Sequence, residues 1–195
     1  LIGAVNWPWP LYFRTGFVRH FDPPLHAWKL NLVAHSLLQG HWLPENGNSN
    51  CFYPNSLTLF YEALHWPQSV LAAGFLLFTD NPILVYNLVH LFFWAFSGCC
   101  LFWLLKEWGC SNRAAAWASA VFCIMPYRVS YLVEFNMQQC FGLILSLLFM
   151  VRFLRRPSIL DACGFAVALW LQAVSELYQA LILATVLPFL ALPWI

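Results

Sequence analysis

The acid at position 22 is the first side chain in the sequence whose setting suits acid–base chemistry. Asp22 stands directly before Pro23 and Pro24, in a chain with only 8 Asp and Glu among 195 residues. A carboxyl group in a partly apolar setting has a raised pKa and can act as a general base toward a hydroxyl. The competing interpretation is a helix cap, because Asp before a proline pair is a typical helix start. Spacing alone leaves both roles open.

A carboxylate and an imidazole stand three residues apart at Glu62 and His65. If this segment is helical, the two side chains face each other on one turn, where they could position a substrate hydroxyl or assist a base. The pair also fits a polar helix face at a membrane surface. The six histidines show neither H-x-x-x-H nor H-E-x-x-H spacing. No metal site and no cofactor are therefore predicted, although a divalent cation is left open.

Arg128 and Glu176 are further charged residues that interrupt apolar sequence. Arg128 follows Pro126 and Tyr127, and an arginine at a membrane edge can bind phosphate through two hydrogen bonds. It can equally extend toward lipid headgroups or pair with Glu134. Glu176 stands two residues before Tyr178 within a long apolar run. An acid inside a membrane is by default a functional hypothesis.

The composition excludes a soluble globular enzyme. Charged residues make up 9% of the chain and hydrophobic residues 62%, with a mean hydropathy of +0.67, whereas soluble domains carry about 25% charged residues. The net charge of +1, without basic runs, argues against nucleic acid as a partner. The seven cysteines form no C-x-x-C pair, which argues against a cysteine metal site or a disulfide framework. The class that remains is a polytopic, all-α membrane protein.

Residues 81–195 consist of long apolar stretches separated by short turns. The pattern predicts four to five transmembrane helices, at about 82–105, 114–127 with an extension toward 133, 137–153, 158–175 and 180–195. The first of them has no charged residue and would extend about 36 Å, enough to cross a bilayer. The chain begins with Leu rather than Met and stops within an apolar stretch. We therefore expect a fragment of a longer chain that lacks at least a first transmembrane helix.

Residues 1–80 are expected to form the end of that first transmembrane segment and a long loop outside the membrane. They hold five of the six histidines and seven of the 12 prolines. Two interfacial helices are predicted in the loop, because tryptophans and polar faces are typical of helices lying in the membrane surface. The first is at 25–39, and the second, within 57–78, is expected to lead into a kinked or re-entrant segment. On the first of them, His26 and Lys29 would lie on the polar side.

The distribution of cations predicts the orientation. The turns 106–113 and 152–156 carry two and three cations, so the positive-inside rule assigns both to the cytoplasm. The 1–80 loop, the 127–138 loop and residues 176–178 then share the outer face. The predicted location is an integral protein of a bacterial inner or plasma membrane.

Several short motifs follow one another in a recognisable order. They are Asp22, Trp28, Asn50-Cys51-Phe52-Tyr53-Pro54-Asn55, Asn81-Pro82, Asn87, Phe96-Ser97-Gly98, Pro126-Tyr127-Arg128, Leu171-Gln172 and Tyr178. In this order they resemble the N-terminal half of the bacterial polytopic membrane glycosyltransferases of the GT-C type, which act in the cell envelope. The resemblance covers most of the chain.

The resemblance implies a polyprenyl-phosphate sugar as donor and a glycan, lipid or protein as acceptor. It implies inverting transfer on the non-cytoplasmic face, with Asp22 as the residue that matches the family's base. In this hypothesis Arg128 offsets charge on the leaving phosphate, and Glu62 and His65 position the acceptor. Tyr127 and Tyr178 are the remaining predicted substrate-binding residues.

Two other interpretations stay open. One is a non-catalytic membrane protein, either a transporter or a lipid-binding assembly component. A transporter is expected to show inverted repeats and broken helices, and the sequence has no visible repeat. The other is an enzyme fold that has lost its activity, because Asp22 stands alone where many members of the family carry a pair of acids.

Overall fold

The computed structural model of the chain is built from helices. It describes residues 9–17, 22–44, 47–49, 54–55, 57–61, 63–131, 135 and 138–191, and no strand occurs within these ranges. The predicted all-α class is thus confirmed for the described residues. In chain order the helices are η1 (Trp9–Tyr12), α2 (Pro23–Leu38), η3 (Thr58–Tyr61), α3 (Trp66–Leu76), α4 (Pro82–Glu107), α5 (Asn112–Ile124), α6 (Pro126–Ser130), α7 (Phe141–Arg155), α8 (Ile159–Ser175) and α9 (Leu177–Ala191).

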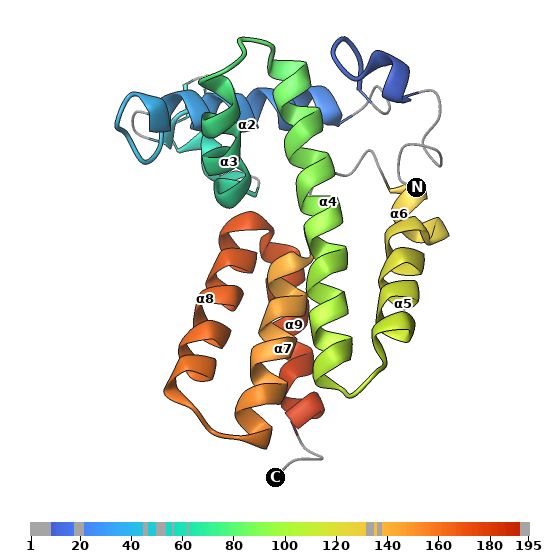
Figure 1. Ribbon diagram of the computed structural model, residues 1–195. Helices are drawn as coiled ribbons and strands as arrows, with labels where there is room; N and C mark the ends of the chain where they lie inside the picture. The colour runs from blue at the N-terminus through green and yellow to red at the C-terminus, as the bar shows by residue number, and fades with distance from the viewer. Residues whose placement is uncertain are drawn as a thin grey trace.

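Helix α4 is the longest element and runs the length of the molecule (Figure 1). Its start is fixed by Asn81, whose side-chain oxygen accepts hydrogen bonds from the N–H groups of Ile83 and Leu84 at 3.1 and 3.0 Å, and by Pro82 in the first turn. Its 26 residues extend about 39 Å. Among the described residues it is the one helix that is both long and apolar enough to cross a membrane. The predicted span 82–105 is confirmed as a helix.

The remaining apolar helices are shorter than the predicted spans. Helices α5, α7, α8 and α9 have 13, 15, 17 and 15 residues, which gives each about 20–26 Å against a hydrocarbon core of about 30 Å. Helix α5 ends because Met125, which precedes Pro126, is extended, and extended Glu176 separates α8 from α9. The predicted bundle of four to five spans is therefore confirmed only as an all-helical bundle.

Helices α7 and α8 form a hairpin that packs closely at Gly142. A Cβ atom at this position would lie 2.8 Å from the carbonyl oxygen of Ala168 and 2.9 Å from the backbone nitrogen of Gln172. Only glycine lets the two backbones approach this closely without a shift. The close contact places Gln172 directly beside the start of α7, where it becomes part of the site described below.

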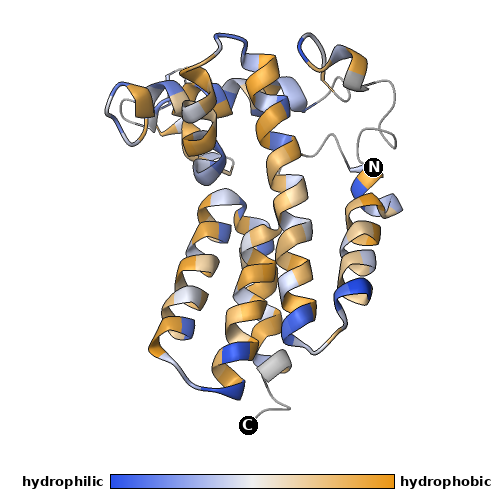
Figure 2. Cartoon of the chain, viewed as in Figure 1, coloured by the Kyte–Doolittle hydropathy of each residue, from blue (hydrophilic) through white to orange (hydrophobic). Residues whose placement is uncertain are grey.

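The charged turns 106–113 and 152–156 lie at one end of the bundle. Nη1 of Arg155 is 3.7 Å from Oε1 of Glu107, so the end of α7 is joined to the end of α4. Figure 2 shows hydrophilic residues at this end and mostly hydrophobic residues along the helices above it. These are the two turns that the positive-inside rule assigns to the same side of the membrane.

Helices α2 and α3 lie across the opposite end of α4 (Figure 1). Leu30 and Ala34 of α2 pack with Ala72 of α3 and with Val85 and Val89 of α4 in one buried core. Helices α2 and α3, which we call the α2–α3 layer, are therefore connected to the bundle through the first half of α4.

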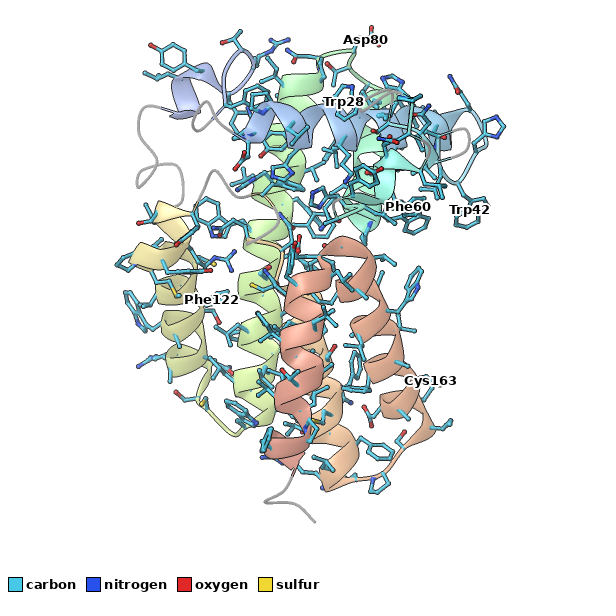
Figure 3. The ribbon with its side chains drawn as sticks, turned by 180° about the vertical axis from the view of Figure 1, so that it is seen from behind. Trp28, Trp42, Phe60, Asp80, Phe122 and Cys163 are labelled. Carbon is cyan, nitrogen blue, oxygen red and sulfur yellow. The ribbon has the colours of Figure 1, made fainter. Side chains whose placement is uncertain are left out.

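Helix α2 occupies the predicted helix 25–39 and begins two residues earlier, at Pro23. Its orientation differs from the prediction, because the polar side faces the protein interior. His26 and Lys29 are 2% and 3% exposed, whereas Leu25 and Trp28 are 46% and 37% exposed; Trp28 is labelled in Figure 3. Polar side chains in this position need partners inside the protein, and the neighbouring segments supply them.

The segment 57–78, predicted as an interfacial helix that leads into a kinked or re-entrant segment, is interrupted in the structure. The segment forms η3 and α3, and residues 63–65 between them are not helical. His65 has a positive φ of 49°, a left-handed conformation that cannot continue a right-handed helix. His65 is therefore not part of the predicted helical turn, and Glu62 lies outside the described residues.

Candidate functional site

A buried polar cluster lies where the α2–α3 layer meets the bundle, and we call it the junction cluster. Each of its side chains is at most 3% exposed. Buried polar groups on this scale are costly unless they are hydrogen-bonded to one another or serve a ligand. The junction cluster consists of His26, Lys29, His65, Gln68, Gln139, Gln172, Ser175 and Glu176.

Helix α2 carries ionisable side chains into the junction cluster along one face. Asp22, His26 and Lys29 are spaced by four and three residues, which places them on the same side of a helix. Asp22 already has helical backbone angles, and its carbonyl oxygen accepts a hydrogen bond from the N–H of His26 at 3.0 Å. Asp22 is half-buried, whereas the other two are buried. The face thus leads from a partly exposed carboxyl group into the protein interior.

His65 connects α2 to α8 through two hydrogen bonds. Its Nδ1 lies 3.2 Å from the carbonyl oxygen of Ser175, and its Nε2 lies 3.2 Å from Nδ1 of His26. A carbonyl oxygen only accepts, so Nδ1 of His65 carries the proton and donates. In the neutral ring Nε2 is then the acceptor, and Nδ1 of His26 is the donor to it.

The charge state of His65 follows from its surroundings. Burial lowers the pKa of His65 well below its ordinary value of 6.5, and electrostatic repulsion from His26 and Lys29 lowers it further. The hydrogen bond to the carbonyl oxygen of Ser175 raises the pKa, but by less. The ring is therefore neutral near pH 7, as the hydrogen-bond directions require.

The ring of Phe135 fills the space between three histidines. Its centroid lies 5.9 Å from that of His26, 5.0 Å from that of His65 and 5.4 Å from that of His90. Phe135 is fully buried. Aromatic contacts at these distances restrict ring rotation, so Phe135 helps to hold the imidazole planes in the orientation that the hydrogen bonds need.

Three glutamines extend the junction cluster toward α8. Nε2 of Gln68 donates to Oε1 of Gln139 at 3.4 Å and also to Oγ of Ser175. Gln172 donates from Nε2 to the carbonyl oxygen of Gln139 at 2.9 Å and accepts from the N–H of Leu143 at 2.9 Å. Within the described residues, Oε1 of Gln68 and Nε2 of Gln139 have no partner although both side chains are fully buried. The junction cluster therefore has hydrogen-bonding capacity left for a polar ligand or water.

Arg128 forms a second buried polar group, in α6. Its Nη2 donates to the carbonyl oxygen of Gln138 at 3.2 Å and its Nη1 to Sγ of Cys140 at 2.9 Å, and its Cζ lies 4.5 Å from the ring centroid of Phe122. In return, Nε2 of Gln138 donates to the carbonyl oxygen of Arg128 at 3.0 Å. Among the described residues no carboxylate lies within ion-pair distance of Arg128. At 2% exposure the guanidinium group does not extend toward lipid headgroups, and that interpretation is wrong.

A cavity of about 270 Å³ lies beside the junction cluster, and we call it the Glu176 cavity. Glu176 belongs to both: its side chain is 1% exposed, and its Oε1 accepts a hydrogen bond from the N–H of Tyr178 at 3.3 Å, which caps the start of α9. The cavity opens between the end of η3 and the α8–α9 corner; Phe60 on its wall is labelled in Figure 3. The other lining residues are Tyr61, Ala63, Leu64, Ala173, Leu177, Tyr178 and Leu181.

Two of the predicted site residues lie in the junction cluster or at the Glu176 cavity, and the other described ones lie elsewhere. His65 belongs to the junction cluster, and Tyr178 lines the Glu176 cavity. Asp22 is the N-cap residue of α2, as the proline pair indicates, but its side chain makes no capping hydrogen bond. Tyr127 is 49% exposed, and its ring pairs with that of Tyr131 at 4.7 Å.

Most of the junction cluster is not predicted by the sequence. The predicted surface position of His26 and Lys29 is wrong, and the sequence predicts no role for Gln139 or Gln172. A signal was present for Gln172, because an amide in the middle of a long apolar helix must find an internal partner. For the α2 residues no signal was present, since only the packing of α2 against α3 and α4 turns its polar side inward.

The arrangement has three chemical capacities. The amide, hydroxyl and imidazole groups can bind the hydroxyl groups of a ligand, because each can donate or accept. The buried cations Lys29 and Arg128 favour an anion, and the half-buried Asp22 can take up a proton. Within the described residues, no group of three or more His, Cys, Asp or Glu side chains is placed to hold a metal ion.

No family model, no curated protein and no solved structure matches the chain.

Proposed function

We propose that this chain is part of an integral membrane glycosyltransferase. It moves a sugar from a polyprenyl-phosphate donor to an acceptor hydroxyl, with inversion, on the non-cytoplasmic face of the membrane. The observation that carries the proposal is the α2 face, on which an accessible acid leads into a buried cluster of hydroxyl-binding groups with Lys29 among them. The motif order that resembles GT-C enzymes supports the same activity.

The outer surface of the bundle supports a membrane location. Trp117 of α5 is 73% exposed, Ile159 and Leu160 of α8 are 77% and 78% exposed, and Phe189 of α9 is 72% exposed. Apolar side chains exposed on this scale are unfavourable in water and are expected to be covered by lipid. The basic turns at one end then face the cytoplasm by the positive-inside rule, and the junction cluster and residues 1–80 lie toward the outside.

The reaction uses Asp22 as base. Asp22 removes the proton of the acceptor hydroxyl, and the oxygen attacks the anomeric carbon of the donor sugar. The bond between that carbon and the phosphate oxygen breaks, and polyprenyl phosphate leaves with the electron pair. Lys29 and Arg128 offset the negative charge that develops on the phosphate. Both cations are buried, which strengthens their electrostatic effect.

The remaining predicted residues have positioning roles in this proposal. His65 orients His26 beside Asp22, and Glu62 contributes with His65 to placing the acceptor. Tyr127 and Tyr178 are substrate contacts at the outer end, and Tyr178 lines the Glu176 cavity. The acceptor is a glycan, a lipid or a protein. The scheme requires no organic cofactor.

The experiment that tests the proposal is sugar transfer by the full-length protein in membranes. The donors are a panel of radiolabelled polyprenyl-phosphate sugars, and Asp22→Asn is compared with wild type and with Asp80→Asn. Asp80 is exposed at the same end of the molecule (Figure 3), so it is a matched control. We expect Asp22→Asn to lose transfer by about 100-fold or more and Asp80→Asn to retain it. Wild-type protein that transfers no sugar from any donor would contradict the activity, and equal transfer by Asp22→Asn would contradict the base.

A transporter is the second candidate, and one observation favours it. Helices α8 and α9 are separated at extended Glu176, and Pro188 lies within α9; transporters place their binding sites at such interruptions. A transporter would bind a lipid-linked or polar solute without cleaving it. Release of polyprenyl phosphate in the same assay separates the two candidates.

A further inference from the structure

We infer that the Glu176 cavity binds a neutral pyranose ring, which is the acceptor sugar of the proposed transfer reaction. The assignment to the acceptor rests on the proposed function, whereas the binding of a sugar ring rests on the cavity alone. Four features of the cavity carry the inference: its size, its aromatic walls, its buried acid and its place beside His65.

The size and walls of the cavity fit one sugar ring. A volume of about 270 Å³ lies just below the range of roughly 300–1,000 Å³ that is typical of drug-sized ligands, so the cavity takes a single ring rather than a long chain. Phe60, Tyr61 and Tyr178 contribute aromatic rings that are 49%, 62% and 68% exposed. The C–H groups on one face of a pyranose pack well on such rings, because they meet the negative face of the aromatic system.

The carboxylate of Glu176 supplies the polar recognition. It lines the cavity while its own exposure is 1%. Its Oε1 accepts from the N–H of Tyr178, and each carboxyl oxygen can accept more than one hydrogen bond. Hydroxyl groups donate to a buried carboxylate in hydrogen bonds that are roughly twice as strong as those between neutral groups. Sugar hydroxyl groups can donate to the carboxyl oxygens of Glu176 while the C–H face of the ring packs on the aromatic side chains that line the cavity.

Charge distinguishes this site from the phosphate end of the donor. Among the described residues, the cavity is lined by the acid Glu176 and by no basic side chain, so its lining offers no cation to a phosphate group. Lys29 and Arg128 do not line it, and they supply the cationic setting that a phosphate needs. The two kinds of substrate therefore have separate positions, with the uncharged acceptor at Glu176.

The cavity is connected to the junction cluster through neighbouring residues. Ser175 precedes Glu176 in the chain, accepts a hydrogen bond from Gln68 and binds His65 through its carbonyl oxygen. A ring bound against Glu176 thus lies beside the segment that orients the His65–His26 pair. This position suits an acceptor whose hydroxyl must reach the base on α2.

The test is direct binding of methyl pyranosides to the purified full-length protein. A polyoxyethylene detergent is used, because its headgroup contains no sugar, and binding is measured by equilibrium dialysis with labelled methyl glucoside, galactoside, mannoside and N-acetylglucosaminide. Ala173→Phe fills the cavity from α8, and Ala166→Phe places the same ring on the exposed side of that helix as a matched control. Glu176→Gln keeps the size of the side chain and an oxygen that can cap α9.

We expect at least one pyranoside to bind, with affinity retained in Ala166→Phe and lost in Ala173→Phe. In Glu176→Gln the affinity should fall about tenfold, because a charged acceptor is replaced by a neutral one. Cyclohexanol, a six-membered ring with a single hydroxyl, should bind more weakly than the best pyranoside. The inference is overturned if no pyranoside binds, if Ala173→Phe binds like its control, or if cyclohexanol binds equally well.

The outcomes separate this inference from the proposed function. Binding that depends on Ala173 and Glu176 without any sugar transfer would support the cavity as a sugar site and refute the transferase. Transfer that is unchanged in Ala173→Phe would support the transferase and refute the cavity as its acceptor site.

Discussion

Nε2 of His65 and Nδ1 of His26 lie 3.2 Å apart and share a hydrogen bond that joins the segment before α3 to α2. The carbonyl oxygen of Ser175 fixes the proton on Nδ1 of His65, and this in turn makes Nδ1 of His26 the donor. His26 lies one helical turn after Asp22 on α2, so the pair connects the start of that helix to Ser175 at the end of α8. The arrangement requires a neutral His65, which leads to the first prediction.

The stability of the protein should fall when the pH is lowered below about 6.5. Above this value His65 is neutral in both folded and unfolded chains and contributes no pH dependence. Below it the unfolded chain binds a proton that folded His65 does not, because the pKa of the folded residue lies well below 6.5. The free energy of unfolding then decreases by at most about 1.4 kcal/mol per pH unit until the pH reaches the folded pKa.

The matched variant for this measurement is His65→Asn. Asparagine tolerates the positive φ at this position and keeps an N–H donor for the carbonyl oxygen of Ser175, but it does not titrate. Thermal unfolding in detergent between pH 8 and 5 should show a smaller loss of stability in His65→Asn than in wild type. Identical pH profiles would contradict the depressed pKa of His65.

Gly142 should be intolerant of any side chain. In Gly142→Ala the new Cβ would meet backbone atoms of α8 at 2.8–2.9 Å, and backbone cannot move aside as a flexible side chain can. We expect a loss of about 1–3 kcal/mol and a lower Tm. Gly74→Ala in α3 is the control, because a Cβ there meets nothing within 4 Å and alanine favours the helix by up to about 1 kcal/mol. Equal Tm values for the two variants would show that α7 and α8 do not pack closely at Gly142.

Much of the helical framework could be predicted from local sequence signals. Asn81-Pro82 marks the start of α4, and the prolines after Asp22 mark the start of α2. Each signal acts within one turn of the chain, so no knowledge of packing is needed. The place of the break within 57–78 has no such signal, because apolar character continues through both helices and only the left-handed backbone of His65 separates them.

The site was less predictable because its polar groups come from distant segments. His65 meets His26 from 39 residues away and Ser175 from 110 residues away, and neither separation has a local signature. Arg128 shows the same limit. At the end of an apolar span an arginine is expected to reach toward headgroups, but Gln138 and the ring of Phe122 cover its charge inside the protein.

Arg128→Lys should destabilise the segment before α7. Lysine cannot bind the carbonyl of Gln138 and the sulfur of Cys140 together while lying flat on the Phe122 ring, so buried acceptors would lose their donors. We expect a cost of about 1–3 kcal/mol in the free energy of unfolding and reduced sugar transfer. Arg113→Lys, at an exposed position near the start of α5, should change neither quantity. Loss of sugar transfer without loss of stability would show that Arg128 acts on the substrate and does not stabilise the fold. If neither quantity changes, Arg128 has neither role.

Cysteine labelling should place the two ends of the molecule on opposite sides of the membrane. Asp80 and Arg156 are both exposed; Asp80 lies beside the α2–α3 layer, and Arg156 follows α7 in the basic turn joined to Glu107. In a background without the seven native cysteines, we expect a membrane-impermeant maleimide to label Asp80→Cys in intact spheroplasts. Arg156→Cys should be labelled only after the membrane is opened, because the positive-inside rule retains basic turns in the cytoplasm. Labelling of both positions from outside would contradict a membrane-spanning bundle, and labelling of Arg156→Cys alone would invert the orientation and move the junction cluster away from any donor on the outer face.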